Sequence, residues 1–173
     1  MIKIISQILG VLGFLFFVFS IQMKDKKKIL GMQLASNIFY TISYLLLGAL
    51  AAVLIDIVSI FRCLIFTYYS DKKEKAPTYV VLVLISLSLL TLLFTFNNYF
   101  DILPVIISII YILTTRSDSR VMIQNGFIMG AILWIIYNLH VENFTPLIGN
   151  VFEIISGIVA VIRFRKKIVK EKK

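Results

Sequence analysis

Seven apolar stretches follow one another along this chain of 173 residues, and short polar breaks separate most of them. They cover about residues 4–21, 29–47, 49–69, 78–96, 100–115, 121–139 and 145–163. A helix that crosses the hydrocarbon core of a bilayer needs roughly 20 consecutive apolar residues. The pattern therefore predicts an all-α integral membrane protein with seven transmembrane helices.

The composition excludes several classes of protein. Hydrophobic residues make up 60% of the chain and charged residues 16%, whereas a soluble domain has about 45–50% and about 25%. The only cysteine, Cys63, allows neither an internal disulfide nor a zinc site. The only histidine, His140, lies in no HExxH motif, and no paired-Asp motif of the GxGD kind is present. We therefore expect no enzyme activity, no cofactor and no metal.

Lys and Arg residues concentrate in alternate breaks between the stretches. Of the 18 basic residues, 16 lie after the first, third and fifth stretches or in the tail. The exceptions are Lys3 and Arg62. Because cytoplasmic loops carry the excess of Lys and Arg, the N-terminus is predicted outside and the C-terminus inside. The net charge of +9 then reflects topology, and we expect no nucleic-acid partner.

The fourth stretch differs from the others because its only polar residues from Val80 to Phe96 are Ser and Thr. A three-helix unit ends on the side opposite to its start, so two such units lie parallel only if one more helix joins them. We predict two parallel three-helix bundles, 1–70 and 99–173, the second with a basic cytoplasmic tail. Residues 71–98 would form a cytoplasmic loop and a linker helix. A weak internal match of 39–44 to 132–137 supports this repeat.

Three ionisable residues fall inside predicted membrane helices: Asp56, Arg62 and Glu153. Each costs roughly 2.5–3.5 kcal/mol at a helix centre, so such residues usually face the interior of a bundle. Arg62 lies nearer the cytoplasmic end, where its side chain can snorkel to the interface, and we interpret it as a structural charge. Asn150 lies three residues before Glu153 and shares its helix face. Hydrogen bonding between helices is the alternative explanation for that pair.

Polar and aromatic residues form one stripe on the second predicted helix, at steps of four, three and four: Gln33, Asn37, Tyr40 and Tyr44. Such a stripe fits either a packed face or the wall of a wet cavity. Trp134 and Tyr137 form a similar surface on the sixth helix. The alternative explanation for these aromatic residues is an interfacial aromatic belt. That explanation suits Tyr137 and Tyr44 better than Trp134 or Tyr40.

The second half of the chain resembles a known transporter repeat. The order Leu133-Trp134, Tyr137, Pro146 and Asn150 is similar to that of the SWEET and SemiSWEET sugar transporters, within the PQ-loop group. In that group a helix-two aromatic and a helix-three Asn line a central pocket for a small polar solute. Trp134 and Asn150 are 16 residues apart, as are Tyr40 and Asp56. Parallel repeats are known for these transporters.

The first half resembles a narrower group. Gln22, the basic turn, Gln33, the segment 46–49 and Arg62 are similar to the YgjV-type bacterial inner membrane proteins. Two departures from the wider group stand out. The Pro-Gln pair is missing near Ile109, and this puts alternating access in doubt. Asp56 replaces an Asn, which shifts the implied ligand from a neutral sugar towards a cation, an amine or a proton-coupled solute.

These observations favour a transporter of a small polar solute in the bacterial inner membrane. Asp56 and Asn150 would hydrogen-bond the solute and Trp134 and Tyr40 would stack on it. Asn37, Tyr137 and Glu153 complete the predicted site, and Asp56 or Glu153 is a candidate to carry a coupling proton. The alternative is a non-transporting membrane protein: a sensor, an immunity factor or a partner-docking subunit. The expected partners are the bilayer and the solute, and a homo-oligomer stays open.

Overall fold

The computed structural model describes residues 2–48, 50–140 and 144–171. In these residues the chain is helical and contains no strand. One short 3-10 helix, η1 (Tyr99–Asp101), precedes the fifth of the seven α-helices. The α-helices are α1 (Ile2–Gln22), α2 (Lys26–Leu47), α3 (Leu50–Asp71), α4 (Thr78–Thr95), α5 (Ile102–Arg116), α6 (Arg120–His140) and α7 (Phe144–Glu171). Each helix overlaps one of the seven predicted stretches, and no stretch extends more than two residues beyond its helix, so the all-helical prediction is confirmed.

Six of these helices are long and apolar enough to cross a membrane: α1 to α6, with η1 included in the fifth span. The six spans have 18 to 21 residues, which at 1.5 Å per residue gives about 27–32 Å, the thickness of a bilayer core. Large apolar side chains face outward along them; Leu93 and Phe94 of α4, for example, are 77% and 75% exposed. The seventh predicted span lies in α7, part of which falls outside the described side chains. By length and composition, six helices in the described residues are therefore candidate membrane spans.

Local sequence signals account for where the helices begin and end. The Asp25 side chain caps α2 by accepting a hydrogen bond from the backbone N–H of Lys27 at 3.0 Å. Gly48 ends α2 with φ of 72°, a left-handed conformation that glycine adopts without steric cost. Asn98 forms a capping box with Asp101 at η1. Pro104 lies in the first turn of α5, where a backbone N–H would have no intrahelical partner.

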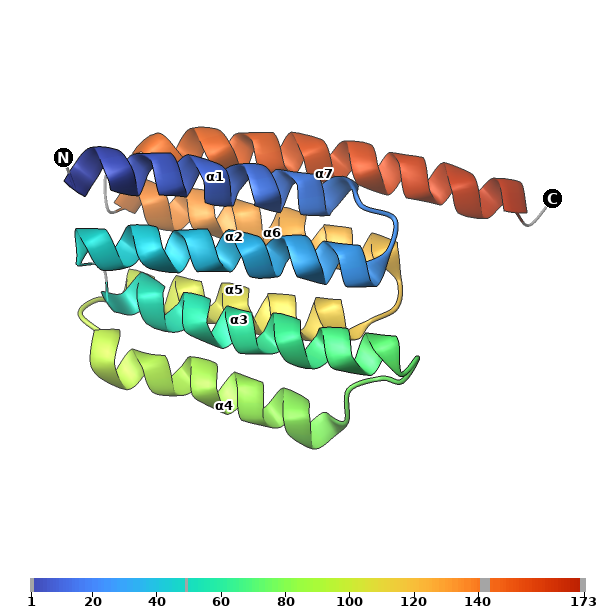
Figure 1. The fold of residues 1–173 in the computed structure, drawn as a ribbon, viewed down its shortest axis with the longest axis horizontal. Helices are drawn as coiled ribbons and strands as arrows, with labels where there is room; N and C mark the ends of the chain where they lie inside the picture. The colour runs from blue at the N-terminus through green and yellow to red at the C-terminus, as the bar shows by residue number, and fades with distance from the viewer. Residues whose placement is uncertain (1, 49, 141–143, 172–173) are drawn as a thin grey trace.

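The helices run alternately up and down the long axis of the molecule in two layers (Figure 1). α1, α2, α3 and α4 form one layer, and α7, α6 and α5 lie behind it. α1 packs against α2 and α7, and α3 packs against α2, α4 and α5. α5, α6 and α7 pack in sequence order, so six helices close into a ring and α4 lies outside it between α3 and α5.

One end of the molecule carries the turns α1–α2, α3–α4 and α5–α6, and the N-terminus lies at the other end (Figure 1). These three turns are the ones that the sequence marks with Lys and Arg. Two salt bridges lie at this end: Lys26 to Asp118 at 2.9 Å and Lys27 to Asp71 at 2.8 Å. The alternation of charge along the chain has thus become a separation of charge in space.

α4 is apolar on its outer face and buried on its inner face. Ser88 and Thr91 donate hydrogen bonds to backbone carbonyls of α4 itself. The Ser88 hydroxyl also lies 2.8 Å from the Ser108 hydroxyl of α5. α4 is therefore attached to the ring by a polar contact as well as by apolar packing.

Two apolar clusters fill the spaces between helices. One joins α1, α2, α5, α6 and α7 and is built around aromatic rings, with the ring centroids of Phe17 and Phe127 5.5 Å apart. The other joins α2, α3, α4 and α5 through Leu30, Phe66, Leu84 and Ile112.

Candidate functional site

The polar stripe of α2 faces the interior. Gln33 and Asn37 are buried, and Tyr40 and Tyr44 are half-buried. The two tyrosine rings stack with centroids 6.1 Å apart and an interplanar angle of 24°. Helical spacing puts all four residues on one side of α2, and packing against α1 and α3 turns that side inward.

Asp56 of α3 reaches the same interior. The residue is half-buried, and its Oδ2 atom is buried without a hydrogen-bond partner among the described residues. A carboxyl oxygen in this state is costly unless a ligand, water or proton satisfies it. Asp56 is thus a candidate to bind a hydrogen-bond donor.

Asn150 and Glu153 of α7 are buried next to each other, 7% and 6% exposed. The Asn150 side-chain nitrogen donates to Oε2 of Glu153 at 3.4 Å. This contact confirms the shared helix face that the spacing of three predicted. Both residues therefore belong to the interior of the ring, where an acid is rare and usually functional.

Trp134 and Tyr137 of α6 meet edge to face, with ring centroids 5.7 Å apart and an interplanar angle of 78°. Trp134 is half-buried and packs against the apolar cluster that contains Phe17 and Phe127. Tyr137 is half-buried as well. Trp134 therefore contributes to packing inside the bundle, as well as presenting a ring to the site.

Among the described residues, the contacts within this set are local to single helices: Tyr40 with Tyr44 on α2, Trp134 with Tyr137 on α6, and Asn150 with Glu153 on α7. Asp56 of α3 is half-buried in the same bundle. Asn37 lies deeper on α2, where its amide contacts the Cys63 sulfur at 3.7 Å.

Arg62 lies in the interior rather than at the interface. Its side chain is 2% exposed and does not snorkel, and its interpretation as a structural charge stays a prediction. Its Nη2 donates to Oε1 of Gln33 at 3.2 Å, and its guanidinium lies 5.4 Å from the ring centroid of Tyr111. The interior packing of α3 against α2 and α5 holds Arg62 inward because all three elements contribute to its surroundings.

Tyr111 and Gln33 were missing from the predicted site. Gln33 belongs to the α2 stripe, which was the available signal. Tyr111 of α5 has no neighbouring polar residue in sequence that would have singled it out, and only its contact with Arg62 does so. Pro146, part of the transporter-like motif, and the basic tail from residue 165 onward lie outside the described side chains.

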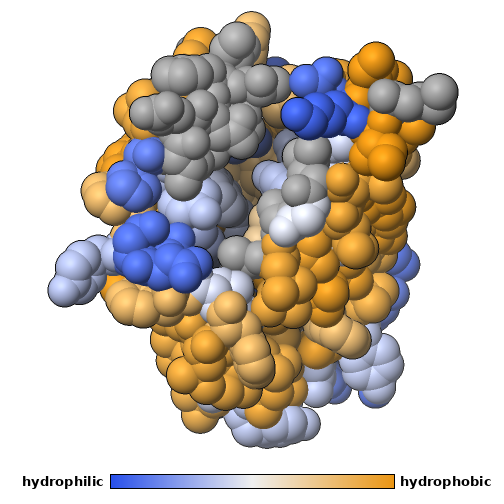
Figure 2. All heavy atoms as spheres, turned by 90° about the vertical axis from the view of Figure 1, so that its left-hand side faces the viewer, coloured by the Kyte–Doolittle hydropathy of each residue, from blue (hydrophilic) through white to orange (hydrophobic). Residues whose placement is uncertain are grey.

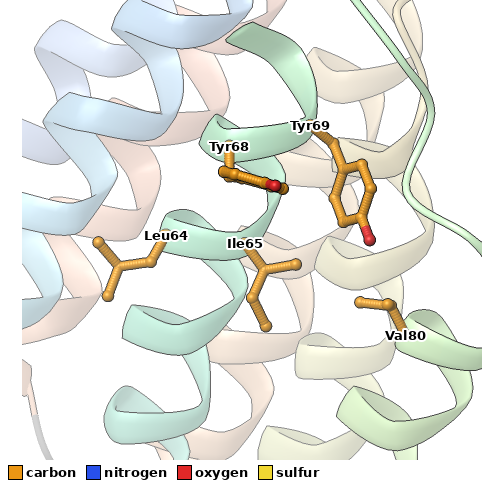
Figure 3. Close-up of a pocket in the computed structure, with 5 residues that line it drawn as sticks. All are labelled: Leu64, Ile65, Tyr68, Tyr69 and Val80. Carbon is orange, nitrogen blue, oxygen red and sulfur yellow. The ribbon is translucent and has the colours of Figure 1, made fainter. Parts of the chain in front are cut away.

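Two shallow hollows on the outer surface are separate from this region. One, about 400 Å³, lies between α3 and α4 and is lined by five residues, Leu64, Ile65, Tyr68, Tyr69 and Val80 (Figure 3). The other lies along α1, between Ile4 and Leu12. Both are lined mainly by apolar atoms and contain no residue of the predicted site. They are suited to contact with acyl chains.

The end of the molecule where α1 begins has a different surface. Figure 2 shows hydrophobic residues on the flanks and paler, weakly polar residues in a recess near the middle of this end. In the part of the chain that the structure describes, no three His, Cys, Asp or Glu side chains gather as a metal site requires.

The fold defines the class: a multi-pass α-helical membrane protein with ionisable groups inside the bundle. The model of the Imp-YgjV family, described as bacterial inner membrane proteins, matches residues 4–168. The chain belongs to this family and is a multi-pass protein of the bacterial inner membrane. No curated protein and no solved structure matches the chain significantly.

Proposed function

We propose that this protein carries a small polar solute across the inner membrane, through a site between two parallel three-helix units. The observation that carries this proposal is the burial of Asn150, Glu153 and one carboxyl oxygen of Asp56 inside a bundle whose outer surface is apolar. Polar and ionisable residues are expensive within a membrane and mark solute or ion pathways there.

The helix neighbours support the two units, α1–α3 and α5–α7. The pairs α1–α2 and α2–α3 correspond to α5–α6 and α6–α7, and the contact of α3 with α5 corresponds to that of α7 with α1. A rotation that exchanges the units leaves this set of contacts unchanged. α4 is then the linker that makes the units parallel, and the relationship to the SWEET and PQ-loop transporters is part of the proposal.

The basic turns support the orientation. The turns that carry Lys and Arg lie at one end of the molecule (Figure 1), and the cytoplasmic side attracts such turns. The end with the recess would then face outward (Figure 2). In this arrangement the solute reaches the interior near Tyr44 and Tyr137, and Asp56 and Asn150 hydrogen-bond it between Tyr40 and Trp134. No step of this proposal requires catalysis.

A ligand screen tests this proposal first. Purified protein in detergent is unfolded thermally with a panel of sugars, amines, amino acids and vitamins, beside the Asn150→Ala variant. A ligand that binds the folded state raises the apparent melting temperature by mass action. We expect one chemical class to raise it in the wild type and to lose most of that effect in the variant. An equal shift in both proteins would exclude Asn150 from the site.

A second candidate is a non-transporting membrane protein that docks a partner. It is favoured by hydrogen bonds that tie helices together: Gln22 Nε2 donates to the Ser156 hydroxyl at 2.6 Å, and Gln124 Nε2 donates to the Ile21 carbonyl at 2.7 Å. Polar groups of this kind hold a bundle together without a ligand. The absence of any thermal shift across a broad panel would favour this candidate.

A further inference from the structure

Arg62 carries a buried positive charge for which the described part of the chain supplies no close negative partner. The salt bridges in that part are Lys26–Asp118 and Lys27–Asp71, and neither includes Arg62. Buried charges are normally paired, because removing an ion from water costs several kcal/mol that only a counter-charge and hydrogen bonds recover. Among the described residues, Arg62 therefore lacks the close counter-charge that a buried ion normally has.

Several hydrogen-bond donors at and around Arg62 have no partner among the described residues: Nε and Nη1 of Arg62, Nε2 of Gln33 and the hydroxyl of Tyr111, all of them buried. They come from α2, α3 and α5. Nη2 of Arg62 donates to Oε1 of Gln33 and lies 3.7 Å from the Cys63 sulfur, and the guanidinium lies 5.4 Å from the ring centroid of Tyr111. Donors grouped around a cation match a group that only accepts hydrogen bonds, such as a carboxylate or a phosphate.

The neighbouring acid decides between these two anions. Asp56 interacts electrostatically with Arg62 but makes no salt bridge with it. It precedes Arg62 by six residues on α3, or about 9 Å along the helix. Asp56 and Glu153 would repel a phosphate dianion, whereas an amine attached to a carboxylate would meet Asp56 with opposite charge.

We propose that Arg62, Gln33 and Tyr111 bind the carboxylate of a small amino-acid-like zwitterion, whose ammonium group faces Asp56. This inference rests on the proposed function and names the class of solute. It also assigns a role to the polar atoms of this cluster that have no partner, since a carboxylate accepts from the guanidinium, the amide and the phenol together. The alternative is an internal pair, in which Asp56 itself neutralises Arg62.

Calorimetric binding to the purified full-length protein tests the proposal, with amino acids, the matching amines without a carboxylate, and sugars as probes. We expect binding of amino acids only. Arg62→Gln should weaken it roughly 10- to 100-fold, the range for a hydrogen bond to a charged group. Arg62→Lys should recover part of the affinity. Arg163→Gln, which removes an exposed arginine on α7, should leave affinity unchanged.

Tyr111→Phe separates binding from folding, because it removes one hydroxyl that has no partner in the bundle. We expect an unchanged or slightly higher melting temperature and an affinity several-fold lower. Equal affinity in the wild type and in Tyr111→Phe and Arg62→Gln would overturn the carboxylate site. The double variant Arg62→Gln/Asp56→Asn gives a second test. If it regains the melting temperature of the wild type and binds with unchanged affinity, Asp56 and Arg62 form an internal pair, and the carboxylate site is overturned.

Uptake into proteoliposomes distinguishes the two proposals. Transport of an amine or a sugar that is insensitive to Arg62→Gln would overturn the carboxylate site and leave the transport function standing. If none of the probes binds or is transported, both proposals are overturned together.

Discussion

At the scale of single residues, the interior of this protein is defined by groups that the bilayer would otherwise exclude. Asp56, Arg62 and Glu153 lie inside a bundle whose outer surface is apolar. Each must be satisfied by neighbours, by a ligand or by a change of protonation. Glu153 has Asn150 as a partner at 3.4 Å, whereas Oδ2 of Asp56 has none among the described residues. Asp56 is therefore the residue at which substitution is most informative.

The charge of Asp56 can be removed at nearly constant size by Asp56→Asn, or reversed by the larger Asp56→Lys. Asp56→Lys places a second cation near Arg62 and should reduce uptake of the solute to background. Asp56→Asn keeps hydrogen-bonding capacity and should retain measurable uptake. The measurement is initial uptake into vesicles, normalised to the amount of protein in the membrane. Phe61→Leu, at an outward-facing position of α3 that is 52% exposed, is the control. Full activity in both Asp56 variants would remove this residue from the pathway.

At the scale of elements, close approach of α5 and α6 depends on small residues. A Cβ added at Gly130 would fall within the ring of Tyr111, and one at Gly126 would overlap Thr114. Glycines at helix interfaces in membranes allow backbones to approach closely. Gly130 therefore leaves room for the ring of Tyr111, which is the ring that the Arg62 guanidinium lies over.

Two glycine substitutions compare this tightly packed position with an open one. Gly130→Ala should lower stability by about 1–3 kcal/mol, the cost of overpacking, and should weaken solute binding by displacing Tyr111. Gly31→Ala, where an added Cβ meets nothing within 4 Å, should be neutral or stabilise α2 by up to roughly 1 kcal/mol. Apparent melting temperatures in detergent compare the two. A neutral Gly130→Ala would show that Tyr111 can move freely.

At the scale of the whole molecule, the separation of charge predicts an orientation in the membrane, with the basic turns on the cytoplasmic side. The basic turns share one end of the bundle (Figure 1), and positive charge is retained on the cytoplasmic side. Because the only cysteine, Cys63, is fully buried, the unchanged protein should react little with thiol reagents. New cysteines in turns at opposite ends then report the topology directly.

Asn98 lies between α4 and α5, and Lys73 lies between α3 and α4. The two variants are Asn98→Cys and Lys73→Cys. An impermeant thiol reagent added to intact cells should label Asn98→Cys, and it should label Lys73→Cys only after the membrane is opened. The unchanged protein, with Cys63 alone, should stay unlabelled. The reverse pattern would invert the orientation, and labelling of both from outside would indicate that the protein inserts in two orientations.

Much of the architecture was predictable from the sequence because, in a bilayer, each span is determined by its own consecutive residues. A helix satisfies its backbone within itself, so apolar length alone locates the spans to within a few residues, as α2 and α4 illustrate. The inward side of α2 and the pairing of Asn150 with Glu153 follow from helical spacing. The exception is Arg62, whose position in sequence suggested an interfacial charge.

What only the tertiary structure decided is which helices are neighbours. Arg62 and Tyr111 are 49 residues apart in sequence, and no local pattern links them. Their contact exists because α3 packs against α5 and closes the ring. The physical reason is that hydropathy records whether a side chain faces lipid or protein, whereas side-chain shape and hydrogen bonds across helices select the partner. The sequence by itself therefore determined a membrane protein with ionisable groups in its spans, and the packing determined which of them meet.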